Sequence, residues 1–191
     1  MNDFLFYLKL GWEHIVSADA LDHQLFILAL IAVYSYRDWK KILILVTAFT
    51  VGHSLTLILS VLDIFRISSG WIEFLIPLTI ALTSADNIMM KNKKSLMKMN
   101  YYLALVFGLI HGMGFANTAR MMIASEQNIA VPLLGFNIGL ELGQIVVVII
   151  AMAVFYIVTE LLKLPIKYWI TGVSAIALVW SCYLAFSRIP F

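Results

Sequence analysis

The sequence predicts an all-α protein: a polytopic membrane helix bundle of about six transmembrane helices, preceded by a short N-terminal interfacial helix. Two observations lead to this prediction. Of the 191 residues, 62% are hydrophobic and only 13% are charged, and the mean hydropathy is +0.95. A water-soluble domain is about half apolar and about a quarter charged, so the composition excludes that class. Apolar runs of about 20 residues, enough to cross a bilayer as a helix, recur along the chain.

Six apolar runs define the expected spans. We place them near 21–36, 42–62, 70–90, 101–123, 131–158 and 168–189. Residues 1–18 lack the basic start and the small-residue cleavage site of a signal peptide, so we expect them to form the interfacial helix. No linker divides the chain, which predicts a single transmembrane domain over residues 1–191.

The distribution of basic residues predicts the orientation. The connections after the first, third and fifth spans hold most of the Lys and Arg residues: Arg37, Lys40, Lys41, Lys91, Lys93, Lys94, Lys98, Lys163 and Lys167. The opposite side holds only Lys9, Arg66, Arg120 and Arg188. Because basic loops stay in the cytoplasm, we expect both termini outside, in the periplasm if the membrane is a bacterial inner (plasma) membrane. A net charge of +2 gives no indication of a nucleic-acid partner.

Polar side chains within the spans indicate a shared site, because ionisable groups in a bilayer are costly and usually functional. The chain has only four histidines: His14, His23, His53 and His111. Counted at about 1.5 Å per helical residue, they fall within or just outside one layer between the outer surface and the midplane. The fifth span adds three polar residues spaced to share one helix face: Asn137, Glu141 and Gln144. We expect these groups to line one pocket open to the periplasmic side.

Glycines predict how the helices pack. Gly135, Gly139 and Gly143 recur every four residues, nearly opposite the polar face of the fifth span, and Gly108 and Gly112 repeat the pattern beside His111. Such small-residue faces allow two membrane helices to approach closely.

Imidazoles with carboxylates are the ligand set of divalent zinc, nickel, cobalt, copper and iron. We expect Ser54, Asn137 and Gln144 to lie behind the ligands or in the cavity, since neutral imidazole ligands need neighbours that fix their tautomer.

Glu73 is expected to be an interfacial anchor, and Glu13 and Asp19 to be solvated. The single cysteine, Cys182, excludes an internal disulfide and a cysteine-based metal cluster.

Five segments together resemble the HupE/UreJ family of hydrogenase and urease accessory membrane proteins. They are GWEHI at 11–15, LDHQLF at 21–26, GHSLTL at 52–57, FGLIHGMGFA at 107–116 and GFNIGLELGQ at 135–144. That family is regarded as six- to seven-helix nickel or cobalt permeases. The resemblance implies that the metal-site positions are His14, Asp22, His23, His53, His111 and Glu141. One departure is the ADAL stretch, where many members have a glycine before the Asp-His pair.

Three functions remain open. In a permease, His14, Asp22 and His23 capture the ion, His53 and His111 hold it deeper, and Glu141 compensates its charge. In an intramembrane zinc-dependent hydrolase, three histidines and an acid hold zinc, with Asp22 and Ser54 as the catalytic groups. The third function is a metal-binding sensor. We favour the permease, mainly through the resemblance, and so do not expect an enzyme. The expected partners are the lipid bilayer and a metal ion (nickel, cobalt or zinc), and a homo-oligomer is left open.

Overall fold

The computed structural model describes residues 3–64, 67–89, 93–123 and 129–190, and these residues form helices and no strand. The long helices are α1 (Asp3–Val16), α2 (Leu21–Ile31), α3 (Trp39–Val61), α4 (Ser69–Met89), α5 (Lys93–Ile123), α6 (Ala130–Tyr156) and α7 (Ile166–Ser187). Short 3-10 turns precede α2 (Ala18–Ala20) and α3 (Tyr36–Asp38), and a π-helical turn (Ile157–Leu161) ends α6. The all-α membrane bundle that the composition predicts is confirmed.

Five helices, α3 to α7, are each long and apolar enough to cross a membrane. The first span differs from the sequence prediction, because the helix expected over 21–36 ends at Ile31. With 11 residues α2 reaches only about 16 Å, short of the roughly 30 Å of hydrocarbon. Helices α1 and α2 pass the length and hydropathy test only together, as a pair bent by 57°. The N-terminal helix and α2 are therefore together the candidate for a sixth, broken span.

Helix α1 packs along α6 because the glycine face of α6 has no side chains to hold it away. A Cβ atom added to Gly139 would collide with the carbonyl oxygen of Leu8, and one added to Gly135 would meet the carbonyl oxygen of Phe4. Gly11 of α1 meets the backbone of Phe136 in the same way. The close helix approach predicted from this glycine repeat is confirmed, and the helix that approaches α6 is the N-terminal helix α1.

Helices α3 and α5 form a second close pair through glycine. A Cβ atom at Gly108 would collide with the carbonyl oxygen of Phe49, and one at Gly112 with that of His53. Gly52 of α3 lies equally close to the carbonyl oxygen of Leu105 on α5. This contact brings the backbone of His53 against the turn of α5 that carries His111.

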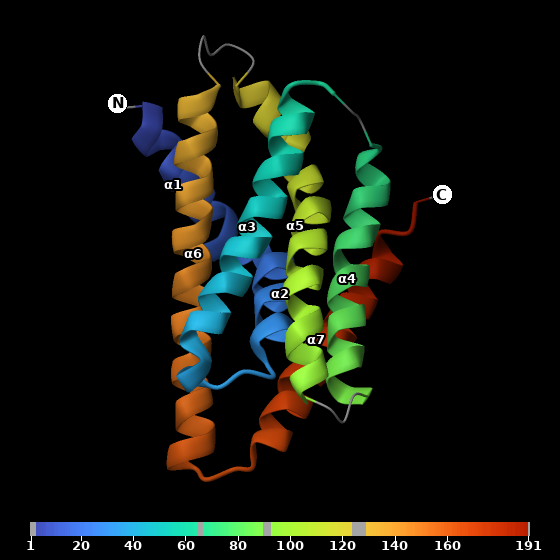
Figure 1. Ribbon diagram of the computed structural model, residues 1–191. Helices are drawn as coiled ribbons and strands as arrows, with labels where there is room; N and C mark the ends of the chain where they lie inside the picture. The colour runs from blue at the N-terminus through green and yellow to red at the C-terminus, as the bar shows by residue number, and fades with distance from the viewer. Residues whose placement is uncertain (1–2, 65–66, 90–92, 124–128, 191) are drawn as a thin grey trace.

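The helices alternate in direction, as successive spans do. Both termini lie toward one end of the bundle, and α3, α5 and α7 run toward that end (Figure 1). Helices α2, α4 and α6 run away from it (Figure 1). Helix α7 packs chiefly on α4, and α2 lies among α4, α6 and α7. The turn between α1 and α2 lies part-way along the bundle rather than at its end (Figure 1).

Candidate metal site

The break between α1 and α2 brings two histidines face to face. His14 lies in the last turn of α1 and His23 in the first turn of α2, and their ring centroids are 4.6 Å apart. The side chain of Gln24 holds the break, because its Nε2 donates to the carbonyl oxygens of Ile15 and Ser17, both at 3.0 Å. The carbonyl oxygen of Ser17 also accepts from the backbone N–H of Ala20 at 3.1 Å, so Gln24 adds a second donor there.

The other two histidines reach the same place from α3 and α5. The ring of His53 lies 5.9 Å from that of His14 and 6.2 Å from that of His23, and the ring of His111 lies 5.0 Å from that of His23. All four histidines of the chain thus form one group, which we call the histidine cluster: His14, His23, His53 and His111. The four side chains that helix depth places in one layer thus lie together, and their depth in the membrane stays a prediction.

Three members of the histidine cluster offer ligand atoms at metal-binding spacing. One nitrogen each of His14, His23 and His53 lies within 4.8 Å of the others. Metal–nitrogen bonds of about 2.0–2.1 Å place tetrahedral ligands about 3.3 Å apart, so small side-chain rotations would close the set around one ion. An all-nitrogen set of this kind suits zinc, nickel, cobalt or copper.

Most ring nitrogens of the histidine cluster lack hydrogen-bond partners among the described residues. Five of them are buried without a hydrogen-bond partner among the described residues: Nε2 of His14, Nε2 of His23, Nδ1 and Nε2 of His53, and Nδ1 of His111. A buried polar atom without a partner costs about 1–3 kcal/mol, and such a group calls for a water molecule or an ion. The donor set therefore fits a metal ion.

A hydrogen bond sets the tautomer of His111. The hydroxyl of Thr79 donates to the carbonyl oxygen of Ile76 at 2.6 Å, and its oxygen lies 3.4 Å from Nε2 of His111. With its proton given to Ile76, the Thr79 oxygen accepts from Nε2–H of His111. Nδ1 of His111 then carries the lone pair, and this nitrogen is the one without a partner.

Phenylalanines surround the histidine cluster. The rings of Phe115 and Phe136 stack at 4.7 Å and lie 4.6 and 5.5 Å from the ring of His14. Phe26 and Phe49 pack on His111 at 5.1 and 5.2 Å. These apolar side chains exclude water, and in such surroundings the attraction between a cation and its ligands is stronger than in water.

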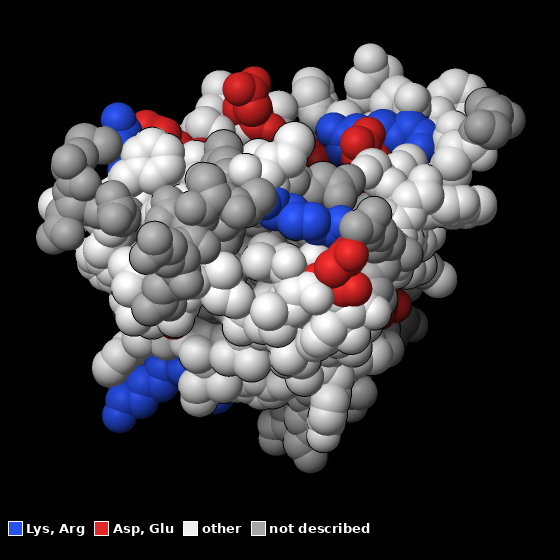
Figure 2. All heavy atoms as spheres, turned by 90° about the horizontal axis from the view of Figure 1, so that it is seen from above, with Lys and Arg blue, Asp and Glu red and all other residues white. Residues whose placement is uncertain are grey.

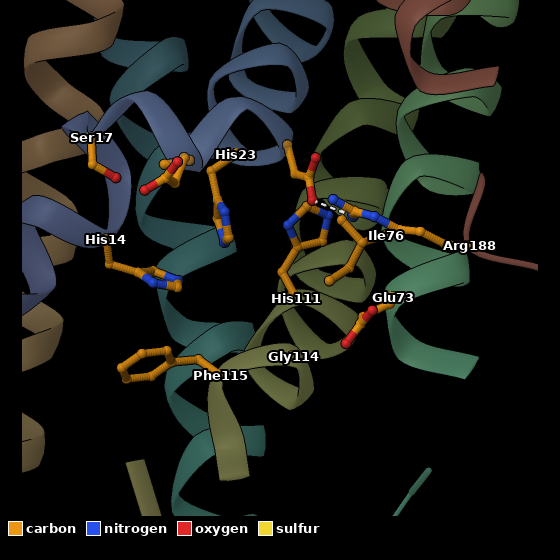
Figure 3. A pocket seen from close by; sticks show the side chains of 12 residues that line it. His14, Ser17, His23, Glu73, Ile76, His111, Gly114, Phe115 and Arg188 are labelled. Atoms are coloured by element: carbon orange, nitrogen blue, oxygen red, sulfur yellow. Dashed lines mark hydrogen bonds and ion pairs between the residues drawn. The ribbon is translucent and has the colours of Figure 1, made fainter. Parts of the chain in front are cut away.

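A pocket of about 310 Å³ opens onto three members of the histidine cluster, His14, His23 and His111, whereas His53 is not part of its lining. Its walls come from α1, α2, α4, α5 and the end of α7: His14, Ser17, Asp19, Ala20, Asp22, His23, Glu73, Ile76, His111, Gly114, Phe115 and Arg188. In Figure 3, the rings of His14, His23 and His111 point into this space from separate helices. The sequence predicts a solvated Asp19 and an anchoring Glu73. Both side chains are exposed, and both also line the pocket. The pocket therefore reaches the surface of the protein.

The model of the HupE/UreJ protein family matches residues 1–187. This chain belongs to the HupE/UreJ family. No curated protein and no solved structure matches the chain. The family and the apolar helices together establish a multi-pass membrane protein.

The polar face of α6 in this HupE/UreJ protein contacts α3. The hydroxyl of Thr47 donates to Oε1 of Glu141 at 2.7 Å, and that of Thr50 donates to Oε1 of Gln144 at 2.9 Å. Polar side chains in membrane helices commonly pair across helices in this way. Neither Glu141 nor Gln144 lines the pocket, so the metal role that the sequence predicts for Glu141 stays a prediction.

Two other residues expected near the ligands also lie outside the pocket lining. The hydroxyl of Ser54 donates to the carbonyl oxygen of Thr50, one turn earlier in its own helix, at 2.6 Å. Asn137 is half-buried, and its Oδ1 has no partner among the described residues.

Asp22 lines the pocket but contacts a residue that sequence reasoning missed. Nη1 of Arg188 lies 2.7 Å from Oδ2 of Asp22. The two residues are 166 positions apart, so no local pattern links them. Thr79 was missed for the same reason, because its hydroxyl reaches the cluster from another helix.

The end of the molecule nearer the termini carries its charged side chains in small separate groups. Figure 2 shows this face from above, with acidic and basic residues among a largely uncharged surface. No broad charged area appears among the described residues in this view. A cation would therefore be selected inside the pocket rather than by long-range attraction.

Proposed function

We propose that this protein is a permease for a divalent transition metal of the nickel/cobalt type, and that the histidine cluster is its binding site. The observation that carries the proposal is the convergence of all four histidines, with five buried ring nitrogens that lack partners among the described residues. Membership of the HupE/UreJ family supports the same cargo.

In this proposal His14, His23 and His53 bind the ion, and His111, which lines the pocket beside His23, offers a fourth nitrogen. Neutral imidazoles bring no negative charge to balance a divalent ion. The acidic side chains that line the pocket are Asp19, Asp22 and Glu73, and they are better placed for this role than Glu141. A hydrated ion would meet these carboxylates first and then exchange water for nitrogen ligands.

A buried polar face on α4 supports movement of the ion past the histidine cluster. Thr79, Thr83 and Asn87 are spaced four residues apart and are 3%, 1% and 5% exposed. Thr79 lies against His111, and Asn87 donates to the carbonyl oxygen of Ala29 near the far end of α2. This face places side-chain oxygen atoms at intervals of one turn along the inner half of α4.

We also propose that the membrane is the bacterial inner membrane and that both termini are periplasmic. The excess of Lys and Arg on the opposite side supports this orientation. A reporter enzyme active only in the periplasm, fused after residue 191, is expected to be active. Activity of a cytoplasmic reporter at the same position would reverse the orientation.

The hydrolase alternative gains no support from the contacts of its proposed catalytic groups. Asp22 is paired with Arg188, and the Ser54 hydroxyl is bonded to the backbone of its own helix. We therefore keep a single candidate function.

Binding and uptake test the proposal separately. Purified protein titrated with Ni²⁺, Co²⁺ or Zn²⁺ in a calorimeter is expected to bind one ion. Proteoliposomes enclosing a metal-sensitive dye are expected to take up the same ion faster than empty vesicles and faster than vesicles with the His23→Ala variant. Binding without uptake would retain the metal site and overturn the permease. Absence of binding by all three metals would overturn both.

A further inference from the structure

A fixed positive charge lies inside the pocket proposed to receive a cation. Arg188 follows the last residue of α7, and its guanidinium lies 2.7 Å from the carboxylate of Asp22. Both side chains line the same pocket as His14, His23 and His111. The dashed line in Figure 3 marks this ion pair, with Arg188 entering the pocket from the side opposite His14.

We propose that Arg188 is a tethered competitor of the metal ion and that its pair with Asp22 is a gate on the pocket. This inference rests on the proposed function, since it requires a metal ion to reach the histidine cluster. Arg188 occupies the carboxylate that precedes His23, so an incoming ion must displace the guanidinium to use Asp22. We call this ion pair the Arg188–Asp22 gate.

The charges give the gate its physical basis. The guanidinium keeps its positive charge at every physiological pH, so it repels any cation in the pocket. The side chains of Arg188 and Asp22 are 31% and 17% exposed, so salt screens the pair less than it would a fully exposed one. Because Arg188 lies just beyond α7, its side chain can leave Asp22 without any helix unwinding.

Competition with an arginine favours divalent cargo. A sodium or potassium ion brings no more charge to Asp22 than the guanidinium that it would replace, and it loses its hydration shell. A divalent ion brings twice the charge and also gains imidazole ligands. The gate therefore lowers the affinity for the transported ion but keeps monovalent ions out of the pocket.

A simpler role for the pair is to fasten the end of α7 to α2. The two roles predict different outcomes for two single variants. If the pair only fastens helices, then Arg188→Gln and Asp22→Asn remove the same contact and change metal affinity in the same direction. If the pair is a gate, the variants act in opposite directions, because one removes the competitor and the other removes its target.

A second arginine–aspartate pair provides a matched control. Nη1 of Arg120 lies 3.5 Å from Oδ1 of Asp63, and the Arg120 side chain is 25% exposed. Neither residue lines the pocket. Arg120→Gln removes the same charge from the molecule and leaves the pocket unchanged, so it measures the effect of net charge alone.

The test is calorimetric titration of wild-type protein and the three variants with Ni²⁺, Co²⁺ and Zn²⁺ in detergent. Arg188→Gln is expected to lower the Kd about three- to fivefold, the upper part of the range for a partly exposed ion pair. Asp22→Asn is expected to raise the Kd, and Arg120→Gln to leave it within about twofold. Added potassium at constant ionic strength is expected to weaken metal binding by Arg188→Gln and not by the wild type.

Thermal unfolding of each variant checks that it is folded, and Arg188→Met replaces Arg188→Gln if the latter does not fold. Weaker binding by both the Arg188 and the Asp22 variant would overturn the gate and leave a structural fastening. Equal effects of Arg188→Gln and Arg120→Gln would also overturn it. If wild-type protein binds none of the three metals, the proposed function fails and the gate fails with it.

Discussion

The ring centroids of His14 and His23 lie 4.6 Å apart across a 57° bend, although the two residues belong to different helices. In a continuous helix, residues nine positions apart would be separated by about 13 Å along the axis. The bend therefore creates the contact that brings two imidazoles together. Gln24 bridges the bend, because its Nε2 donates to the carbonyl oxygens of Ile15 and Ser17.

Gln24→Leu is expected to weaken metal binding by loosening this bend. The variant removes the side-chain donor from the carbonyl oxygens of Ile15 and Ser17. The Ser17 carbonyl keeps the N–H of Ala20, so the cost of an unpaired group, about 1–3 kcal/mol, falls on Ile15. The metal Kd should rise and the unfolding temperature should fall. Glu13→Gln, at an exposed position on the same helix end, is the control. An unchanged Kd in Gln24→Leu would show that the bend does not depend on this side chain.

Gly139→Ala is expected to separate α1 from α6. The added methyl group would collide with the carbonyl oxygen of Leu8, and overpacking of this kind costs about 1–3 kcal/mol. Because α1 carries His14, metal affinity should fall together with the unfolding temperature. Gly172→Ala is the matched control, since a Cβ atom there meets nothing within 4 Å. Equal unfolding temperatures for the two variants would contradict the close contact.

The sequence allowed the packing surfaces and the histidine layer to be predicted. Glycines at fixed helical spacing, such as Gly139 and Gly108, mark where backbones touch, because spacing along one helix determines which residues share a face. The depth of His53 and His111 follows from helix rise in the same way. Both predictions need only the geometry of a single helix.

The rest depends on which helices become neighbours. The polar face with Glu141 was correctly grouped, but periodicity could not reveal that it meets Thr47 of α3. The bend after α1 falls in SADA, which has no glycine or proline to mark a break, so the apolar run alone placed one span over 21–36. Arg188 reaches Asp22 only through the packing of α7 on the bundle.

His53→Leu is expected to stabilise the protein without metal and to abolish its response to metal. His53 is fully buried, and neither ring nitrogen has a partner among the described residues. Replacing a buried polar group that lacks partners with an apolar one of similar volume removes a penalty of about 1–3 kcal/mol. A bound metal should raise the unfolding temperature of the wild type, by linkage, and not that of the variant.

Thermal unfolding with and without Ni²⁺, Co²⁺ or Zn²⁺ measures both effects of His53→Leu. The buried Thr56→Val, one turn along the same face, is the control for a polar-to-apolar change on α3 and should keep the response to metal. Destabilisation of the metal-free protein by His53→Leu would indicate a histidine that holds the helices together rather than a ligand.

Thr83→Val is expected to slow uptake and leave binding unchanged, because it removes an oxygen from the polar face of α4 beyond the histidine cluster. The hydroxyl of Thr83 donates to the carbonyl oxygen of Thr79 at 3.0 Å, within its own helix, so its loss leaves the packing between helices intact. The substitution nearly preserves shape, and Thr171→Val on the exposed face of α7 is the matched control.

Uptake into proteoliposomes should fall several-fold for Thr83→Val alone, while the calorimetric Kd of both variants stays at the wild-type value. Equal uptake by the two variants would mean that the ion does not pass along this face, whereas a raised Kd for Thr83→Val would mean that Thr83 acts on the binding site itself.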